Sequence, residues 1–253
     1  MSLADLARTL LDLHHEPTTL VLPNVWDAWS ARTVAETGFP ALAIGSHPLA
    51  DSRGQGDHED MTLADALDGV RRICGAVPDL PVTADLESGY DTPAAELIDR
   101  LLDAGAVGLN IEDTVHSDGG RMREPQEHAD YIGALRQAAD ASGVDVVVNA
   151  RTDVFLKADS FDDPVEEALS RLRLCEAAGA RCVYPVGVRD EASLQTLLDG
   201  LDGPVNVIAS PRTGSSVGGL AELQRLGVHR VTFGPKLMQD LAPDLQALVS
   251  GWR

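Results

Sequence analysis

Carboxylates follow a short apolar run in the middle of the chain, and their spacing points to metal-assisted chemistry. Asp85 and Glu87 come directly after residues 81–84, at alternate positions. Side chains two residues apart point the same way from an extended strand, so both acids are expected on one face at its C-terminal end. Two adjacent carboxylates repel each other unless a cation offsets their charge. An all-oxygen ligand set without a Cys or His pattern favours Mg²⁺ or Mn²⁺ over zinc.

The same arrangement occurs twice more along the chain. Residues 108–111 lead into Glu112, and residues 146–149 lead into Arg151. A single acid after a strand is equally well explained as a helix cap or a turn residue. Three charged strand ends in succession are better explained by one functional cluster, made of Asp85, Glu87, Glu112 and Arg151.

The elements that must position this cluster alternate regularly. Apolar runs typical of strands begin near residues 19, 41, 81, 108, 145, 182, 205 and 229, and a helical pattern follows each one. Near-continuous apolar strands that alternate with amphipathic helices indicate a parallel sheet covered by helices. Eight such repeats in 253 residues predict an α/β fold, a (β/α)8 TIM-type barrel with a short N-terminal helix, in which chemistry takes place at the C-terminal ends of the strands.

The connections are expected to be short, with two exceptions. A polar loop is predicted over 45–62, before a helix at 63–76 that Thr62 caps, and another over 114–124. No linker or low-complexity segment interrupts the pattern, so we expect one barrel domain spanning 1–253.

Composition excludes several classes of partner. The formal net charge of −20 argues against binding to nucleic acid or to an anionic membrane surface. No run is apolar enough to cross a bilayer, and the first residues lack the pattern of a signal peptide. The cysteines Cys74, Cys175 and Cys182 have no C-x-x-C spacing, so we expect buried packing residues in a reducing cytoplasm.

The segments TADLESGYD, GLNIEDT and NARTD, together with GSHPLADSRGQGDHEDMT, resemble the isocitrate lyase and phosphoenolpyruvate mutase superfamily over nearly the whole barrel. The resemblance implies that Asp85 binds Mg²⁺, with Glu87 and Glu112 holding the ion directly or through water. It also implies that Arg151 contacts the carboxylate or oxo oxygen of a substrate.

Further roles follow from the same resemblance. Ser46 and His47, with the backbone N–H groups of their turn, would seat the carboxylate of a 2-oxo acid. Asp57 matches a family aspartate that approaches the reacting bond. Family members are commonly tetramers that exchange a C-terminal helix, so the resemblance implies a homo-oligomer, either a dimer or a tetramer.

The chain departs from the family in the loop after Glu112. Isocitrate and methylisocitrate lyases carry K-K-C-G-H there, and the mutases and phosphonopyruvate hydrolases carry a Lys and an Asn. This chain reads TVHSDGGRMR at 114–123, and Ile44 stands where the mutase has a tryptophan. The polar loop would close over the substrate as a lid, with His116 as a candidate catalytic group. Arg121 would read a second carboxylate or a phosphonate, and Tyr90 would form a pocket wall.

These features predict a Mg²⁺-dependent lyase that cleaves a C–C bond of a small 2-oxo or 2-hydroxy carboxylate, such as an oxaloacetate-like or methylisocitrate-like acid, through an enolpyruvate. Decarboxylation is the simplest form because it needs no lid cysteine. One alternative is C–P chemistry on phosphonopyruvate or carboxyphosphonoenolpyruvate. Another is a barrel that binds a metal and a 2-oxo acid without turnover.

Overall fold

Parallel strands form a closed barrel in the computed structural model, which describes residues 1–253. One sheet has the order β2 (Asn24–Val25), β3 (Leu42–Ile44), β4 (Val82–Asp85), β5 (Gly108–Glu112), β8 (Val147–Thr152) and β9 (Cys182–Pro185). A second sheet has the order β1 (Leu20–Leu22), β11 (Arg230–Thr232) and β10 (Asn206–Ile208).

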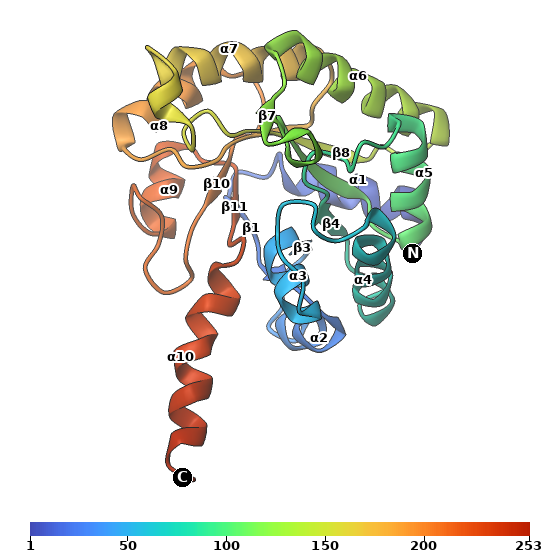
Figure 1. The fold of residues 1–253 in the computed structure, drawn as a ribbon, viewed down its shortest axis with the longest axis vertical. Helices are drawn as coiled ribbons and strands as arrows, with labels where there is room; N and C mark the ends of the chain where they lie inside the picture. Colours follow the sequence, from blue (N-terminus) through green and yellow to red (C-terminus); the bar gives the residue numbers. More distant parts are fainter.

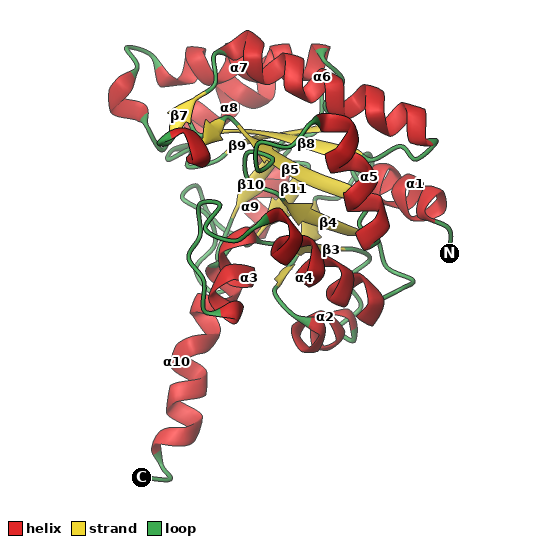
Figure 2. Ribbon diagram, turned by 45° about the vertical axis from the view of Figure 1, so that its right-hand side comes forward, coloured by secondary structure: helices red, strands yellow, loops and turns green.

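Two links join these sheets into a ring. β1 and β2 are one run of chain interrupted only at Pro23, whose carbonyl accepts a hydrogen bond from Ala43 N at 3.0 Å. On the other side, a parallel bridge between Val183 and Val205 connects β9 to the residue that precedes β10. The predicted TIM-type barrel is therefore confirmed, with the strands at the centre and the helices outside them (Figure 2).

Seven helices that follow strands surround the barrel: α2 (Ala28–Ala35), α4 (Leu63–Ala76), α5 (Ala94–Ala104), α6 (Pro125–Ser142), α7 (Pro164–Ala177), α8 (Glu191–Gly200) and α9 (Leu220–Leu226). The capping signals in the sequence act where they were predicted. Thr62 Oγ1 accepts a hydrogen bond from Asp65 N at 3.1 Å at the start of α4. Gly105, with φ of 95°, ends α5 in the left-handed conformation, which glycine adopts without strain.

The N-terminal helix α1 (Leu3–Leu13) closes the bottom of the barrel. Its buried residues Leu6, Ala7 and Leu10 form a small apolar cluster with Leu20, Ala41, Val107 and Val147, which lie at the beginnings of strands. The opposite end, where the strands terminate, remains available for a site. None of the helices is both long and apolar enough to span a membrane.

The two predicted loops contain secondary structure. Residues 46–53 form the helix α3 (Ser46–Arg53), which was predicted as loop. Only Leu49 and Ala50 in its middle give it an apolar face, too short a pattern to indicate a helix from sequence. The second loop is an antiparallel hairpin of β6 (Thr114–Val115) and β7 (Arg121–Met122) around the 3-10 turn η1 (His116–Asp118). A further 3-10 turn, η2 (Ala158–Ser160), follows β8.

The last helix, α10 (Lys236–Ser250), extends away from the barrel (Figure 1). It buries none of its residues, and it exposes Leu241, Leu245, Leu248 and Val249, with Trp252 just beyond it. A row of large apolar side chains on one element without a partner is unusual for an isolated chain.

Candidate active site

A polar cavity of about 240 Å³ lies at the C-terminal ends of the strands. Five of the side chains predicted from the sequence line it: Ser46, His47, Asp57, Asp85 and Arg151. They come from α3, the α3–α4 loop, β4 and β8. Asn24, Asn110, Tyr184 and Thr232, on four other strands, also line it.

Asp85 is the last residue of β4 and points into this cavity. Its Oδ2 accepts a hydrogen bond from Ser46 Oγ at 3.4 Å, and its Oδ1 accepts one from Glu87 N at 3.3 Å. Burial raises the pKa of Asp85 above its usual value, Arg151 opposes that shift, and Asp57 adds to it. A cation bound beside Asp85 would therefore favour the ionised form of this carboxylate.

Glu87 is close to Asp85, although not in the way that strand alternation predicted. The chain leaves the extended conformation after β4, and Glu87 has φ of 49°, in the left-handed region that non-glycine residues rarely adopt. Its carboxylate accepts hydrogen bonds from Tyr90 Oη at 2.9 Å and from Glu59 N at 2.6 Å. Burial and the neighbouring Asp85 raise the pKa of Glu87 to about 8.

The buried Glu112 and the partly buried Arg151 form an ion pair between β5 and β8. These residues are register partners, and Arg151 Nη1 lies 2.5 Å from Glu112 Oε2. The Arg151 Nε also donates to Asp153 Oδ1 at 2.7 Å, and His116 Nε2 lies 2.6 Å from Glu112 Oε1. Burial raises the pKa of Glu112 to about 7, although Arg151 acts in the opposite direction. The Arg151 guanidinium thus pairs with two buried carboxylates, those of Glu112 and Asp153.

The donor set fits a hydrated divalent cation. No three His, Cys, Asp or Glu side chains converge as direct ligands of one ion, so the three predicted acids do not form a complete protein cage. Mg²⁺ commonly takes one or two carboxylates directly and keeps several waters. Asp85 in the cavity wall, with Glu87 and Glu112 behind it, matches that mode. Burial and the neighbouring carboxylates raise the pKa of all three acids, and a bound cation would favour their ionised forms.

Three other predicted residues lie outside the cavity wall. Arg121 is half exposed, and its guanidinium pairs with Asp118 and Glu127. The Tyr90 hydroxyl is bound to Glu87 instead of facing the cavity. His116 holds Glu112 from the side of the hairpin. The polar groups of all three residues are thus bound to nearby carboxylates and do not face the cavity.

Arg123, another charged residue of the hairpin, is structural. It is buried, stacks on Tyr131 at 4.7 Å, and donates to the backbone carbonyls of Glu112 at 3.0 Å and Ser88 at 2.9 Å. These bonds tie the ends of β4 and β5 together. Asp113, next to Glu112, similarly supports the end of β8 by accepting hydrogen bonds from Thr152 Oγ1 at 2.6 Å and Asp153 N at 2.9 Å.

The hairpin is held against the α3–α4 loop. The Glu59 carboxylate accepts hydrogen bonds from Ser88 Oγ at 2.6 Å, Tyr90 N at 3.0 Å and Ser117 N at 3.2 Å. The His58 ring stacks on the His116 ring with centroids 4.5 Å apart. Glu59 thus connects the hairpin to the α3–α4 loop and to the residues that follow β4, a role that nothing in its sequence context indicated.

Sequence reasoning also missed the polar floor of the cavity. Asn110 Oδ1 accepts hydrogen bonds from Asn149 Nδ2 at 2.8 Å and from Arg230 Nη2 at 3.3 Å. The signal was present, because Asn110 lies two residues before Glu112, and Asn149 two before Arg151. Alternate residues of a barrel strand point inward, so these amides lie one layer below the charged residues.

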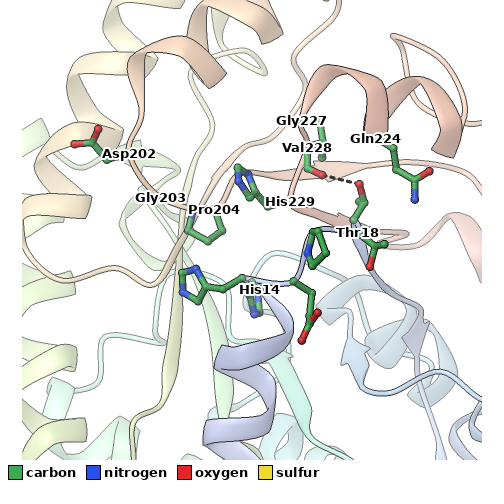
Figure 3. A pocket seen from close by; sticks show the side chains of 13 residues that line it. His14, Thr18, Asp202, Gly203, Pro204, Gln224, Gly227, Val228 and His229 are labelled. Carbon is green, nitrogen blue, oxygen red and sulfur yellow. Dashed lines mark hydrogen bonds between the residues drawn. The ribbon is translucent and has the colours of Figure 1, made fainter.

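A second hollow, of about 530 Å³, lies at the opposite end of the barrel (Figure 3). Among its lining residues are His14, His229 and Asp202. His14 is buried and its pKa is lowered to about 3, mainly by burial, so it is neutral at ordinary pH. His14 Nδ1 contacts the Leu10 carbonyl at 2.7 Å. No group of metal-ligating side chains forms there.

The cysteines take no part in either hollow. All three are free and buried, and burial raises the pKa of Cys74 and Cys175 to about 12. Cys182, on β9, is raised to about 11 for the same reason. A thiol with such a pKa is a poor nucleophile or proton donor at neutral pH, which agrees with the predicted packing role.

The sequence model of the phosphoenolpyruvate phosphomutase family matches residues 10–251 of this chain. The carboxyvinyl-carboxyphosphonate phosphorylmutase of Arabidopsis thaliana is 30% identical over 194 residues, which cover 73% of this chain and 56% of that protein. The chain therefore spans about half of that relative. An oxaloacetate decarboxylase of Pseudomonas savastanoi pv. phaseolicola is 29% identical over 209 residues, covering 81% of this chain and 70% of the relative.

Solved structures are similar over the whole fold. The crystal structure of a proposed phosphonomutase from Burkholderia cenocepacia J2315 has a TM-score of 0.89 and 42% sequence identity, and the match covers 97% of this chain and 99% of that one.

Proposed function

Since the chain belongs to the phosphoenolpyruvate mutase/isocitrate lyase superfamily, we propose that it is a Mg²⁺-dependent lyase that cleaves a C–C bond of a small 2-oxo or 2-hydroxy carboxylate. An oxaloacetate-like acid is the leading substrate. The oxaloacetate decarboxylase relative supports this choice, as does the size of the cavity, about 240 Å³, which suits a small acid better than a drug-sized ligand.

The observation that carries the proposal is the juxtaposition of Asp85 and Arg151 in one cavity wall. Cleavage of the bond between C3 of a 2-oxo acid and its departing group places negative charge on the ketone oxygen as an enolate forms. Preorganised positive groups aimed at that position lower the barrier, and removing one such donor typically costs about 10²–10³ in kcat. Arg151 is fixed for this role by its contacts to Glu112 and Asp153.

Mn²⁺ is an alternative to Mg²⁺, and either ion would be held by Asp85, with Glu87 and Glu112 acting through water. When bound, such an ion supplies Lewis acidity at the ketone and carboxylate oxygens of the substrate. Side chains of the protein itself orient the substrate. Arg151 orients the substrate, and the Glu112–Arg151 pair keeps that guanidinium in place.

The substrate carboxylate is placed at the start of α3. Gly45 is the N-cap of this helix and offers no side-chain cap, so the first-turn amides are available to an anion. A Cβ at Gly45 would lie 2.9 Å from Pro48 Cγ and 3.3 Å from Asn24 Nδ2, which explains why glycine precedes Ser46. The Ser46 hydroxyl, already turned toward Asp85, would contact the same carboxylate.

Proton transfer is assigned to Asp57. It lines the cavity, and its Oδ1 is buried without a hydrogen-bond partner. His116 is assigned a supporting role, because its ring is bound to Glu112. Arg121 and Tyr90, whose polar groups have other partners, are left out of the proposed substrate contacts.

C–P chemistry on phosphonopyruvate or a carboxyphosphonoenolpyruvate is the second candidate. The similarity to the Arabidopsis phosphorylmutase and to the Burkholderia phosphonomutase favours it. Against it stands the short hairpin at 114–122, which carries neither Lys nor Asn. Arg121, the hairpin residue predicted to contact a phosphonate, is paired with Asp118 and Glu127 instead.

A substrate panel tests the proposal. Oxaloacetate, 2-methylisocitrate and phosphonopyruvate are each incubated with Mg²⁺, and pyruvate, phosphate and phosphoenolpyruvate are followed, with and without EDTA. The expected result is pyruvate from a carboxylate substrate, lost on chelation and in Asp85→Ala. Turnover of phosphonopyruvate alone would transfer the assignment to C–P chemistry. No turnover above the metal-only rate, with oxalate plus Mg²⁺ still raising the Tm, would identify a non-catalytic binder.

We also propose that the protein is a homo-oligomer, a dimer or a tetramer. The exposed apolar residues of α10, such as Leu245 and Leu248, support association with further copies of the chain. Light scattering of the purified protein is expected to give a mass of at least two chains, and Leu245→Glu combined with Leu248→Glu is expected to reduce it.

A further inference from the structure

The His47 ring lies between two carboxylates on the rim of the active-site cavity. His47 Nδ1 is 3.1 Å from Asp57 Oδ2, and His47 Nε2 is 3.3 Å from Asp51 Oδ2. Asp51 lies one helical turn after His47 on α3, whereas Asp57 belongs to the loop after that helix. Both ring nitrogens therefore have a carboxylate oxygen as partner.

Exposure falls steadily along this row of three side chains. The exposed fraction of the side chain is 54% for Asp51, 41% for His47 and 22% for Asp57. At the inner end, Asp57 Oδ1 is buried and lacks a hydrogen-bond partner. The row thus runs from solvent at Asp51 to Asp57, a residue that lines the cavity.

The proposed reaction needs such a path. After C–C cleavage the enolate must take up a proton at C3, and the donor must then recover its proton from solvent. The hairpin contains no cysteine, and His116 is engaged with Glu112. Asp57 is the remaining acid that lines the cavity apart from Asp85, which is assigned to the metal.

We propose that Asp51, His47 and Asp57 form a proton relay between solvent and the reacting carbon, an inference that rests on the enolate chemistry proposed above. In a decarboxylation, the bond between C3 and the leaving carboxylate breaks, its electron pair forms the enolate, and CO₂ departs. Asp57 then gives its proton to C3, receives one from His47 Nδ1, and His47 recovers one at Nε2 through Asp51 or water. One solvent proton is consumed per turnover.

His47 acts here as a positioning and relay residue, since Asp57 is the member of the relay that is assigned to contact the reacting carbon. The other groups that face this pair are His58, whose Nε2 lies 3.9 Å from Asp57 Oδ2, and Asp85 across the cavity. His58 is 70% exposed and stacked on His116, so it is a poorer partner for Asp57 than His47. The pH dependence of the relay therefore reflects Asp51, Asp57, His58 and Asp85 as well as His47.

Exchange of the methyl protons of pyruvate in D₂O tests the relay without knowledge of the natural substrate. Pyruvate and Mg²⁺ are incubated with the full-length protein, and loss of the methyl signal is followed by proton NMR between pH 5.5 and 9. Wild type is expected to catalyse exchange. Asp57→Asn is expected to slow it by roughly 10²-fold or more, in the range of general acid–base contributions, and His47→Gln by roughly 10-fold or more.

Two controls separate a relay from a structural role. His15→Gln, the same change at an exposed histidine at the other end of the barrel, is expected to leave exchange unchanged. In His47→Ala, added imidazole is expected to restore part of the lost rate and the wild-type pH profile. Asp51→Asn is expected to lower the rate by a smaller factor than His47→Gln.

The outcomes distinguish this relay from the lyase assignment. Exchange that depends on His47 in a protein that cleaves no acid of the panel would support the relay and reject the proposed substrates. The relay would be overturned by exchange at the wild-type rate in His47→Gln, or by no exchange in the wild-type protein. It would also be overturned if His47→Gln lost exchange and imidazole did not restore it in His47→Ala.

Discussion

Arg151 Nη1 lies 2.5 Å from Glu112 Oε2, and the two residues are directly paired in the register of β8 and β5. The same guanidinium reaches Asp153 and faces the cavity that Asp85 lines. One partly buried cation thus connects the strand ends to the position where substrate charge would develop.

Replacement of Arg151 is expected to affect both catalysis and folding. Arg151→Lys keeps a charge but loses the forked geometry, so kcat/KM should fall by roughly 10²-fold or more. Arg151→Met leaves Glu112 and Asp153 without their partner, which should lower the free energy of unfolding by about 3 kcal/mol. Urea denaturation and steady-state kinetics measure the two effects. Arg181→Met, which removes the exposed pair with Asp145, serves as the control, with a change below about 1 kcal/mol.

The metal-free protein is expected to lose stability as pH rises from 6.5 to 8. Glu87 and Glu112 have pKa values of about 8 and 7 in the folded chain against the usual 4.5. Over the interval from 4.5 to 8 the folded state binds more protons than the unfolded state, so stability falls with rising pH. His14 and His128, with pKa values lowered to about 3, act in the opposite direction only below about pH 6.5.

Thermal denaturation in EDTA at pH 6.5, 7.25 and 8 checks this pH dependence. Mg²⁺ should raise the Tm most at pH 8, where the carboxylates are ionised, and Glu87→Gln should flatten the EDTA profile. A profile that is flat in wild type, or equally steep in Glu87→Gln, would show that these carboxyl groups are ionised in the folded protein without a metal.

Glu59 is expected to hold the hairpin closed. Glu59→Ala removes the acceptor of Ser88, Tyr90 and Ser117, so amide hydrogens at 114–122 should exchange faster by roughly 10-fold, since a hydrogen bond to a charged group contributes about 1.5–3 kcal/mol. Hydrogen exchange followed by mass spectrometry measures this. Glu96→Ala, which breaks the surface pair with Arg100 on α5, should not change exchange at 114–122. Unchanged exchange in Glu59→Ala would show that other contacts, such as His116 with Glu112 and the His58–His116 stack, hold the hairpin.

Arg230 is fully buried and forms no ion pair. Its contacts are Asn110 Oδ1 at 3.3 Å and His14 Nε2 at 3.4 Å, and its Nε has no partner. Because burial of an isolated charge is costly, Arg230→Met is expected to raise the free energy of unfolding by about 1 kcal/mol, while oxalate binding weakens. Arg136→Met, which removes a buried arginine paired with Asp140 and Asp145, should instead destabilise. Destabilisation by Arg230→Met would show that its polar neighbours offset the cost of burial.

The barrel could be predicted from the sequence because apolar strands, caps and glycine stops repeat at regular spacing. The charged strand ends could be predicted for the same reason, since every parallel strand delivers its last residues to one rim. What could not be predicted was which side chains turn inward after the strand ends. Glu87 changes direction through its φ of 49°, and Arg121 turns to Glu127, six residues away. Such choices depend on tertiary partners rather than on local spacing.

The helix α3 is another element that local sequence spacing could not predict. Its sequence SHPLADSR has no extended apolar period, and it is stabilised by packing of Leu49 against the core and by Arg53, which donates to Asp68 on α4 at 2.9 Å. The position of His47 between Asp51 and Asp57 depends on this helix. The sequence alone placed His47 near the substrate but gave no reason to connect it with either aspartate.

The central claim is that Asp85 and a divalent cation together hold a 2-oxo acid beside Arg151. Isothermal titration of oxalate, a planar mimic of the enolate of pyruvate, measures it directly in wild type and Asp85→Asn, each with Mg²⁺ and with EDTA. Oxalate is expected to bind wild type only with Mg²⁺ and to bind Asp85→Asn at least 10-fold more weakly under the same conditions. Equal affinity with Mg²⁺ and with EDTA, or an affinity unchanged in Asp85→Asn, would contradict the account.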